Sequence, residues 1–78
     1  MTLTMYSRPG CHLCDVMMSV IRRVTSGRDC AVEMIDISGR PDLEARYGVD
    51  IPVLLVDGVR VAQHRISDAE LGRILGEQ

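Results

Sequence analysis

Two cysteines three positions apart, Cys11 and Cys14, stand where one periodic pattern ends and another begins. Upstream, a short β-prone run at residues 3–7 is closed by a Pro-Gly turn signal. Downstream, apolar residues recur at helical spacing, and Gly27 can end the helix. The members of this apolar stripe are Leu13, Val16, Met17, Val20, Ile21 and Val24. The pattern predicts a strand, a tight turn and a helix whose first turn carries both sulfur atoms.

The rest of the chain alternates between strand-like and helix-like segments separated by turn signals. The expected segments are a strand at residues 31–37, a short helix at 41–47 that Gly48 stops, strands at 51–56 and 59–62 joined by the Asp57-Gly58 turn, and a helix from Ser67 to Gly76 that opens with a capping box. The order is strand, helix, strand, helix, strand, strand, helix. It predicts an α/β fold with a four-stranded mixed sheet flanked by three helices.

Length and composition restrict the chain to one small domain, residues 1–78. Its formal net charge of −2 offers little attraction to phosphate, so nucleic acid is not an expected partner. No apolar run approaches the roughly 20 residues that span a bilayer, so no membrane association is expected. The start of the sequence does not resemble a secretion signal, and a single CxxC pair is typical of a reducing compartment, so the expected location is the cytoplasm.

The predicted helix start gives the two cysteines different chemistry. Cys11 lies where unpaired N–H groups and the positive end of the helix dipole meet, which favours the thiolate and lowers its pKa from about 8.5. We therefore expect Cys11 to be the nucleophile and Cys14, one turn deeper, to be the resolving thiol. Arg8 can add positive charge near the thiolate, whereas Asp15 opposes its ionisation.

The remaining polar and sulfur-containing residues receive simpler interpretations. His12 is interpreted as an exposed first-turn residue with a modest influence on the redox potential, rather than as an essential base. Cys30 is interpreted as a small buried hydrophobe. A zinc site built from the cysteines and His12 or His64 matches no closed zinc pattern, so no metal is expected. Four further residues are interpreted as packing groups: Met17, Met18, Met34 and Tyr47.

Motifs along nearly the whole chain carry a family resemblance. They are Tyr6-Ser7-Arg8-Pro9-Gly10-Cys11-His12-Leu13-Cys14, Asp36, Tyr47-Gly48, Ile51-Pro52-Val53 and Asp57-Gly58. Through them the sequence resembles the small bacterial glutaredoxin-like proteins of the thioredoxin superfamily, which implies a thioredoxin-like fold. The resemblance also implies a cis bond before Pro52, packed beside the CxxC motif, with the backbone of Ile51 open to a bound peptide or glutathione. The expected substrate-binding residues are Arg8, His12, Ile51 and Pro52.

The function that the motif and the resemblance predict is thiol–disulfide exchange with protein disulfides or glutathione mixed disulfides. No resident cofactor is expected, and glutathione is the candidate co-substrate. Residues 65–68 stand where typical glutaredoxins carry a Gly-Gly pair, so glutathione would rely on Arg8 and Asp68 to contact its carboxylate and amine. The expected partner is a disulfide-containing protein or glutathione, and the chain is expected to be a monomer. The alternative is a non-catalytic binding module or metal-carrying adaptor on the same fold.

Overall fold

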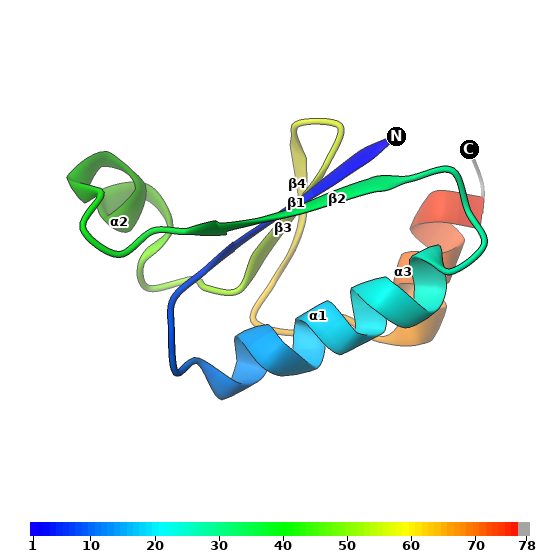
Figure 1. Cartoon of the computed structure of the whole chain (residues 1–78), viewed down its shortest axis with the longest axis horizontal. Coiled ribbons are helices and arrows are strands. Elements are labelled where there is room, and N and C mark those ends of the chain that lie inside the picture. Colours follow the sequence, from blue (N-terminus) through cyan, green and yellow to red (C-terminus); the bar gives the residue numbers. More distant parts are fainter. Residues whose placement is uncertain (77–78) are drawn as a thin grey trace.

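The computed structural model describes residues 1–76 and has the expected order of strands and helices (Figure 1). The strands are β1 (Thr2–Ser7), β2 (Ala31–Asp36), β3 (Val53–Val56) and β4 (Val59–Gln63), and the helices are α1 (His12–Thr25), α2 (Pro41–Tyr47) and α3 (Asp68–Gly76). The strands form one sheet in the order β2-β1-β3-β4. Strands β1 and β2 are parallel and the other pairs are antiparallel, so the sheet is mixed, as predicted.

The hairpin between β3 and β4 follows the local turn chemistry. Asp57 and Gly58 both have positive φ angles, 49° and 83°, which a two-residue type I′ turn requires. Strand β3 begins at Val53, two residues later than predicted, because Pro52 has no N–H to donate to a ladder. Strand β4 continues to Gln63, one residue beyond the prediction, after a register shift opposite β3.

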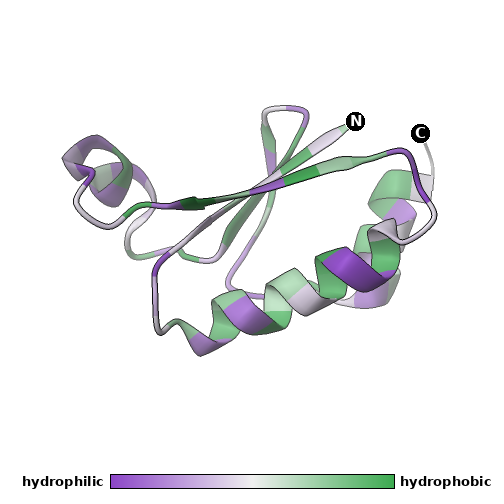
Figure 2. Cartoon of the chain, viewed as in Figure 1, coloured by the Kyte–Doolittle hydropathy of each residue, from purple (hydrophilic) through white to green (hydrophobic). Residues whose placement is uncertain are grey.

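Helices α1 and α3 lie together on one face of the sheet, and Figure 2 shows apolar and polar residues alternating along both. Alternate strand residues such as Met5 and Leu54 face these helices across the main core. The buried members of this core are Leu3, Met5, Cys14, Met17, Met18, Val20, Ile21, Leu54, Val56, Ile66, Leu71 and Leu75. The core thus fixes α1, the helix that carries both motif cysteines.

The opposite face of the sheet carries a smaller cluster that includes α2. Its buried members are Ile37, Tyr47 and Val53. The rings of Tyr6 and Tyr47 stack with centroids 4.1 Å apart. Burial, followed by the effect of Tyr47, raises the pKa of Tyr6. The packing role predicted for Tyr47 is confirmed.

Val16, a member of the predicted apolar stripe, and Met34, a predicted packing group, are exposed instead of buried. Val16 is 43% exposed, although Met17 beside it is buried, because the chain that follows β4 leaves a hollow over this side of α1. Met34 is 60% exposed because it belongs to β2, the edge strand, of which five of the six residues are exposed. The prediction was wrong for both residues, whereas Met17 and Met18 are buried as predicted.

Candidate active site

Cys11 is the N-cap residue of α1. Its backbone is extended, with φ −88° and ψ 107°, and its sulfur accepts a hydrogen bond from the backbone N–H of Cys14 at 3.2 Å. Its carbonyl oxygen accepts the next helical hydrogen bond, from Asp15, also at 3.2 Å. The Cys11 sulfur therefore occupies the position that a serine or aspartate oxygen usually takes at a helix start. A donor aimed at this sulfur stabilises negative charge on it.

Cys14 completes the pair from one helical turn further on. The two Cα atoms are 5.2 Å apart, within the range of about 4.4–6.8 Å seen for disulfide-bonded cysteines, and the two residues are joined as a disulfide. Cys11 is half-buried, whereas Cys14 is only 3% exposed and belongs to the main core. This difference in exposure is what an attacking thiol and a resolving thiol require.

The turn before the helix directs the motif out of the sheet. The backbone N–H of Cys11 donates to the carbonyl of Arg8 at 3.3 Å, which closes the turn after β1. Gly10 adopts a φ of 77° there, a conformation that glycine accepts without steric cost. The Pro-Gly signal in the sequence therefore forms the tight turn that connects the end of β1 to the start of α1.

The side chain of Arg8 is directed toward α2. Its Nη2 atom lies 3.0 Å from Glu44 Oε1, and both side chains are about 40% exposed. Asp36, at the end of β2, has its pKa lowered first by the backbone N–H of Ser38, at 2.8 Å, and further by the charge of Arg8. Within residues 1–76, the Arg8 guanidinium forms no hydrogen bond or ion pair with either motif cysteine. Arg8 lies in the turn before the motif, but part of its charge is compensated by Glu44.

The Ile51–Pro52 bond is cis, as the family resemblance implies. Pro52 is fully buried, and half-buried Ile51 packs against the same core cluster as Cys11. The backbone N–H of His64, in the segment after β4, donates to the carbonyl of Pro52 at 2.8 Å. The proline loop and the start of α1 are therefore both anchored on the main core.

An acidic residue that the sequence analysis did not identify holds this loop. Asp50 accepts a hydrogen bond from Arg60 Nη1 at 3.2 Å, and its other oxygen lies 3.9 Å from His64 Nε2. The guanidinium of Arg60 also lies over the ring of Tyr47, 5.3 Å from its centroid. No local signal marks Asp50 in the sequence, because its partners come from a different strand and a different connection.

The remaining predicted positions lie as follows. His12 is exposed at the first position of α1. Asp68 forms two hydrogen bonds with Arg23 of α1, at 2.9 and 3.0 Å, and these lower the pKa of the Asp68 carboxyl. Its carboxylate is thus paired with Arg23 in this structure, and a contact with a glutathione amine stays a prediction. Cys30 is half-buried against the main core, so it is less buried than predicted.

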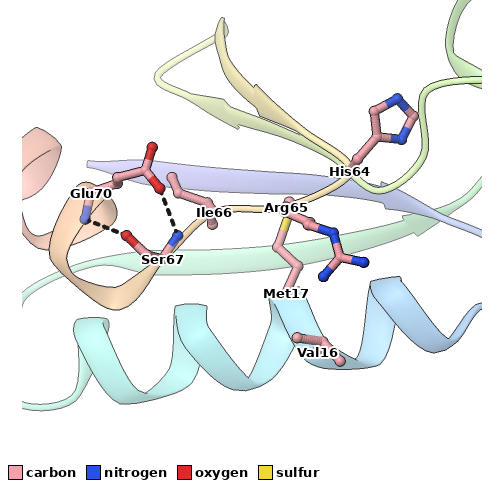
Figure 3. Close-up of a pocket in the computed structure, with 7 residues that line it drawn as sticks. All are labelled: Val16, Met17, His64, Arg65, Ile66, Ser67 and Glu70. Carbon is pink, nitrogen blue, oxygen red and sulfur yellow. Dashed lines mark hydrogen bonds between the residues drawn. The ribbon is translucent and has the colours of Figure 1, made fainter.

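Two hollows lie beside α1. One, of about 160 Å³, is lined by the turn before the motif, by Cys14 and by the exposed side chain of Met34. The other, of about 300 Å³, lies between α1 and the segment that connects β4 to α3 (Figure 3). Cys14 therefore borders a hollow on the side of β2, and the larger hollow follows α1 beyond the motif.

Residues 2–76 match the glutaredoxin-like domain family (DUF836). The chain belongs to this family. The glutaredoxin-like chain is similar to protein XcR50 from X. campestris, with 29% identity, 97% of each chain covered and a TM-score of 0.82. It is also similar to protein Ne2328 from Nitrosomonas europaea, with 28% identity, 94% of this chain and 88% of that chain covered, and a TM-score of 0.77.

Thioredoxin 1 from Thermosipho africanus shares the fold of this glutaredoxin-like chain. The identity is 20%, with 99% of this chain and 92% of that chain covered, and the TM-score is 0.70. A search of curated proteins gave no match. Membership of the family and the thioredoxin-like fold are thus established, as the sequence predicted.

Two further findings concern the described part of this glutaredoxin-like chain. No helix within residues 1–76 is long and apolar enough to cross a membrane. The same residues contain no group of three or more His, Cys, Asp or Glu side chains arranged to hold a metal ion.

Proposed function

We propose that this glutaredoxin-like chain is a thiol–disulfide oxidoreductase in which Cys11 attacks and Cys14 resolves. The observation that carries the proposal is the hydrogen bond from the Cys14 N–H to the Cys11 sulfur at the start of α1. At this position Cys11 is only half-buried while its partner is buried, so an incoming disulfide reaches Cys11 first. A helix start lowers the pKa of a cysteine thiol and so raises the fraction present as thiolate at neutral pH.

The reaction proceeds through two exchanges. The Cys11 thiolate attacks one sulfur of the substrate disulfide, that bond breaks, and the released substrate thiolate takes a proton from solvent. Cys14 then loses its proton to solvent and attacks the Cys11 sulfur, which breaks the mixed disulfide and releases the second substrate thiol. The substrate gains two electrons and the chain is left with the Cys11–Cys14 disulfide. A low-molecular-weight thiol such as glutathione, or a dithiol reductase, returns the two electrons.

The surroundings of the motif support roles in substrate binding. The backbone of Ile51, before the buried Pro52, would pair with an extended segment of the substrate, as the family resemblance implies. Exposed His12 and the partly neutralised Arg8 would contact the same segment. A single CxxC pair of this kind works in a reducing compartment, so we place the activity in the cytoplasm, with a monomeric chain acting on disulfide-containing proteins or glutathione.

A titration of the thiols tests the proposal. The protein is equilibrated in glutathione buffers of defined ratio, its free thiols are blocked with a maleimide, and the products are weighed by mass spectrometry. We expect Cys11 and Cys14 to become protected together in one two-electron transition, while Cys30 stays labelled. Loss of one thiol at a time, with no bond between Cys11 and Cys14, would contradict the mechanism.

Two variants complete this experiment. Cys14→Ser lacks the resolving thiol, so it should accumulate a mixed disulfide at Cys11 with the substrate or with glutathione. Cys30→Ser is the matched control, because it removes the third thiol and leaves the pair intact. A Cys14→Ser protein that forms no mixed disulfide would exclude Cys11 as the attacking group.

A further inference from the structure

The larger hollow beside α1, about 300 Å³, has an apolar floor (Figure 3). We call it the side pocket. Val16 and Met17 contribute to it from α1, and Ile66 contributes from the segment after β4. Val16 is 43% exposed, while Met17 and Ile66 are buried. An exposed valine next to buried apolar neighbours offers contact area to an apolar side chain of a ligand.

The two ends of the side pocket carry different polar groups. Ser67 and Glu70 lie at one end, where the Glu70 carboxylate already accepts the N–H of Ser67 at 3.1 Å. His64 and Arg65 lie at the other end. In the described part of the chain, the Arg65 guanidinium has no hydrogen bond or ion pair. At one end of the side pocket, the Glu70 carboxylate is therefore bound to the Ser67 N–H. At the other, cationic end, the Arg65 guanidinium is open to a ligand.

The cationic end is the end nearer the candidate active site. In Figure 3, α1 enters the view from its N-terminal part on the side of His64 and Arg65. The N–H of His64 also donates to the carbonyl of Pro52, which connects this end to the proline loop. A substrate segment that extends along this loop from Cys11 would bring its next side chains to Arg65 and Val16.

We infer that the side pocket selects protein disulfides whose cysteine is flanked by an apolar and an acidic side chain. The inference rests on the proposed thiol–disulfide exchange and adds the substrate class. The apolar side chain covers Val16, and the carboxylate pairs with Arg65. The occupant that we assign is a protein segment, because the side pocket continues from the proline loop through His64 and offers an apolar floor beside the Arg65 guanidinium, which adjacent apolar and acidic side chains of an extended peptide would fit.

The proposed pairing of a substrate carboxylate with Arg65 is tested with two peptide disulfides. They differ only in having glutamate or glutamine beside the cysteine. An exposed ion pair contributes modestly, so we expect kcat/KM for reduction to be about two- to fivefold higher for the glutamate peptide at low salt. High salt should reduce this ratio because it screens exposed charges. Arg65→Glu should invert the preference. Arg22→Glu is the matched control, since Arg22 is an exposed arginine of α1 outside the side pocket.

The outcomes separate this inference from the proposed function. Exchange with both peptides at equal rates, or a preference that Arg65→Glu and Arg22→Glu change equally, would overturn the inference and leave the oxidoreductase proposal standing. Absence of exchange with both peptides, while oxidised glutathione is still reduced, would overturn the inference alone, and absence of exchange with the peptides and with oxidised glutathione would contradict the proposed function as well. An equal loss of activity toward oxidised glutathione and the glutamate peptide in Arg65→Glu would also overturn the assignment of a protein substrate.

A second variant tests the apolar floor. Val16 lies on the surface of α1, so Val16→Ser leaves the core residues in place. For peptides with leucine beside the cysteine, we expect kcat/KM to fall about two- to fivefold, because part of a buried apolar contact is lost. Peptides with serine at that position should be unaffected. A loss of the same size for both peptides would count against the side pocket as the contact.

Discussion

Helices α1 and α3 begin with the same kind of hydrogen bond, made by different atoms. At the start of α3, Ser67 Oγ accepts the N–H of Glu70 at 3.0 Å and the Glu70 carboxylate accepts the N–H of Ser67 at 3.1 Å. At the start of α1, the acceptor is the sulfur of Cys11, which receives the N–H of Cys14 at 3.2 Å. The cap of α3 satisfies two donors with two oxygen acceptors.

The difference teaches how one local rule serves two purposes. The oxygen atoms at α3 keep their covalent bonds in every state of the protein, so that cap contributes stability alone. The sulfur at α1 can change its covalent partner and its charge, and the same donor then stabilises the thiolate. On the proposed function, a helix start therefore contributes stability at α3 and thiol reactivity at α1.

The largest effect is expected when the reactive cap is replaced by an inert one. Cys11→Ser keeps a side chain that caps a helix well, but it has no thiol to attack a disulfide. We expect complete loss of exchange with near-native helix content by circular dichroism. Cys30→Ser should retain activity in the same assay. Residual exchange in Cys11→Ser would show that another thiol attacks. The cap of α1 would then have no special role in reactivity.

Ser67→Ala removes the oxygen that caps α3. Losing an N-cap acceptor typically costs about 1 kcal/mol, with a range of about 0.5–2 kcal/mol, and we expect a loss of this size in urea denaturation. Alkylation of Cys11 in the reduced protein should keep its rate. Ser67→Asp is the control, because aspartate also caps a helix. An altered alkylation rate in Ser67→Ala would mean that the two helix starts are coupled.

A smaller effect is expected for the structural part of the Cys11 cap. Cys11→Ser and Cys11→Ala both lack the disulfide, so their difference reports the cap alone. We expect Cys11→Ala to be less stable by about 0.5–1 kcal/mol in urea denaturation, since only serine can accept the Cys14 N–H. Equal stability of the two variants would show that capping at α1 contributes nothing to folding.

The smallest effect is expected in acid and concerns α3. The N–H and hydroxyl of Ser67 lower the pKa of Glu70, and Arg23 lowers that of Asp68. A carboxyl whose folded pKa lies below its unfolded value of about 4 stabilises the protein above that pH, and the contribution is lost as pH falls through the folded pKa. Stability should therefore decline in this acid range, and less steeply in Asp68→Asn. An unchanged slope in that variant would argue against the Arg23–Asp68 pair.

Local chemistry explains why the order of elements could be predicted from the sequence. Pro41 opens α2, the Asp57-Gly58 pair forms the hairpin turn, and Ser67 caps α3, and each acts on residues near it in the chain. The same is true of the CxxC motif, since Cys11 and Cys14 are one helical turn apart. Such features need no knowledge of distant neighbours.

The features that could not be predicted depend on residues far apart in the chain. Val16 fits the helical stripe, but its exposure depends on how the segment after β4 crosses α1. Met34 is exposed because its strand lies at the sheet edge, and the strand order is not a local property. Asp68 is bound to Arg23, 45 positions away, a pairing that no short motif encodes.

The contacts of Asp50 have a consequence for the oxidation cycle. They join the proline loop to Arg60 and His64, and none of them involves a motif cysteine. On the proposed function, we therefore expect reduction of the Cys11–Cys14 bond to leave these supports of Pro52 in place. We expect the two oxidation states to differ mainly in the first turn of α1, so that a partner meets the same proline surface before and after electron transfer.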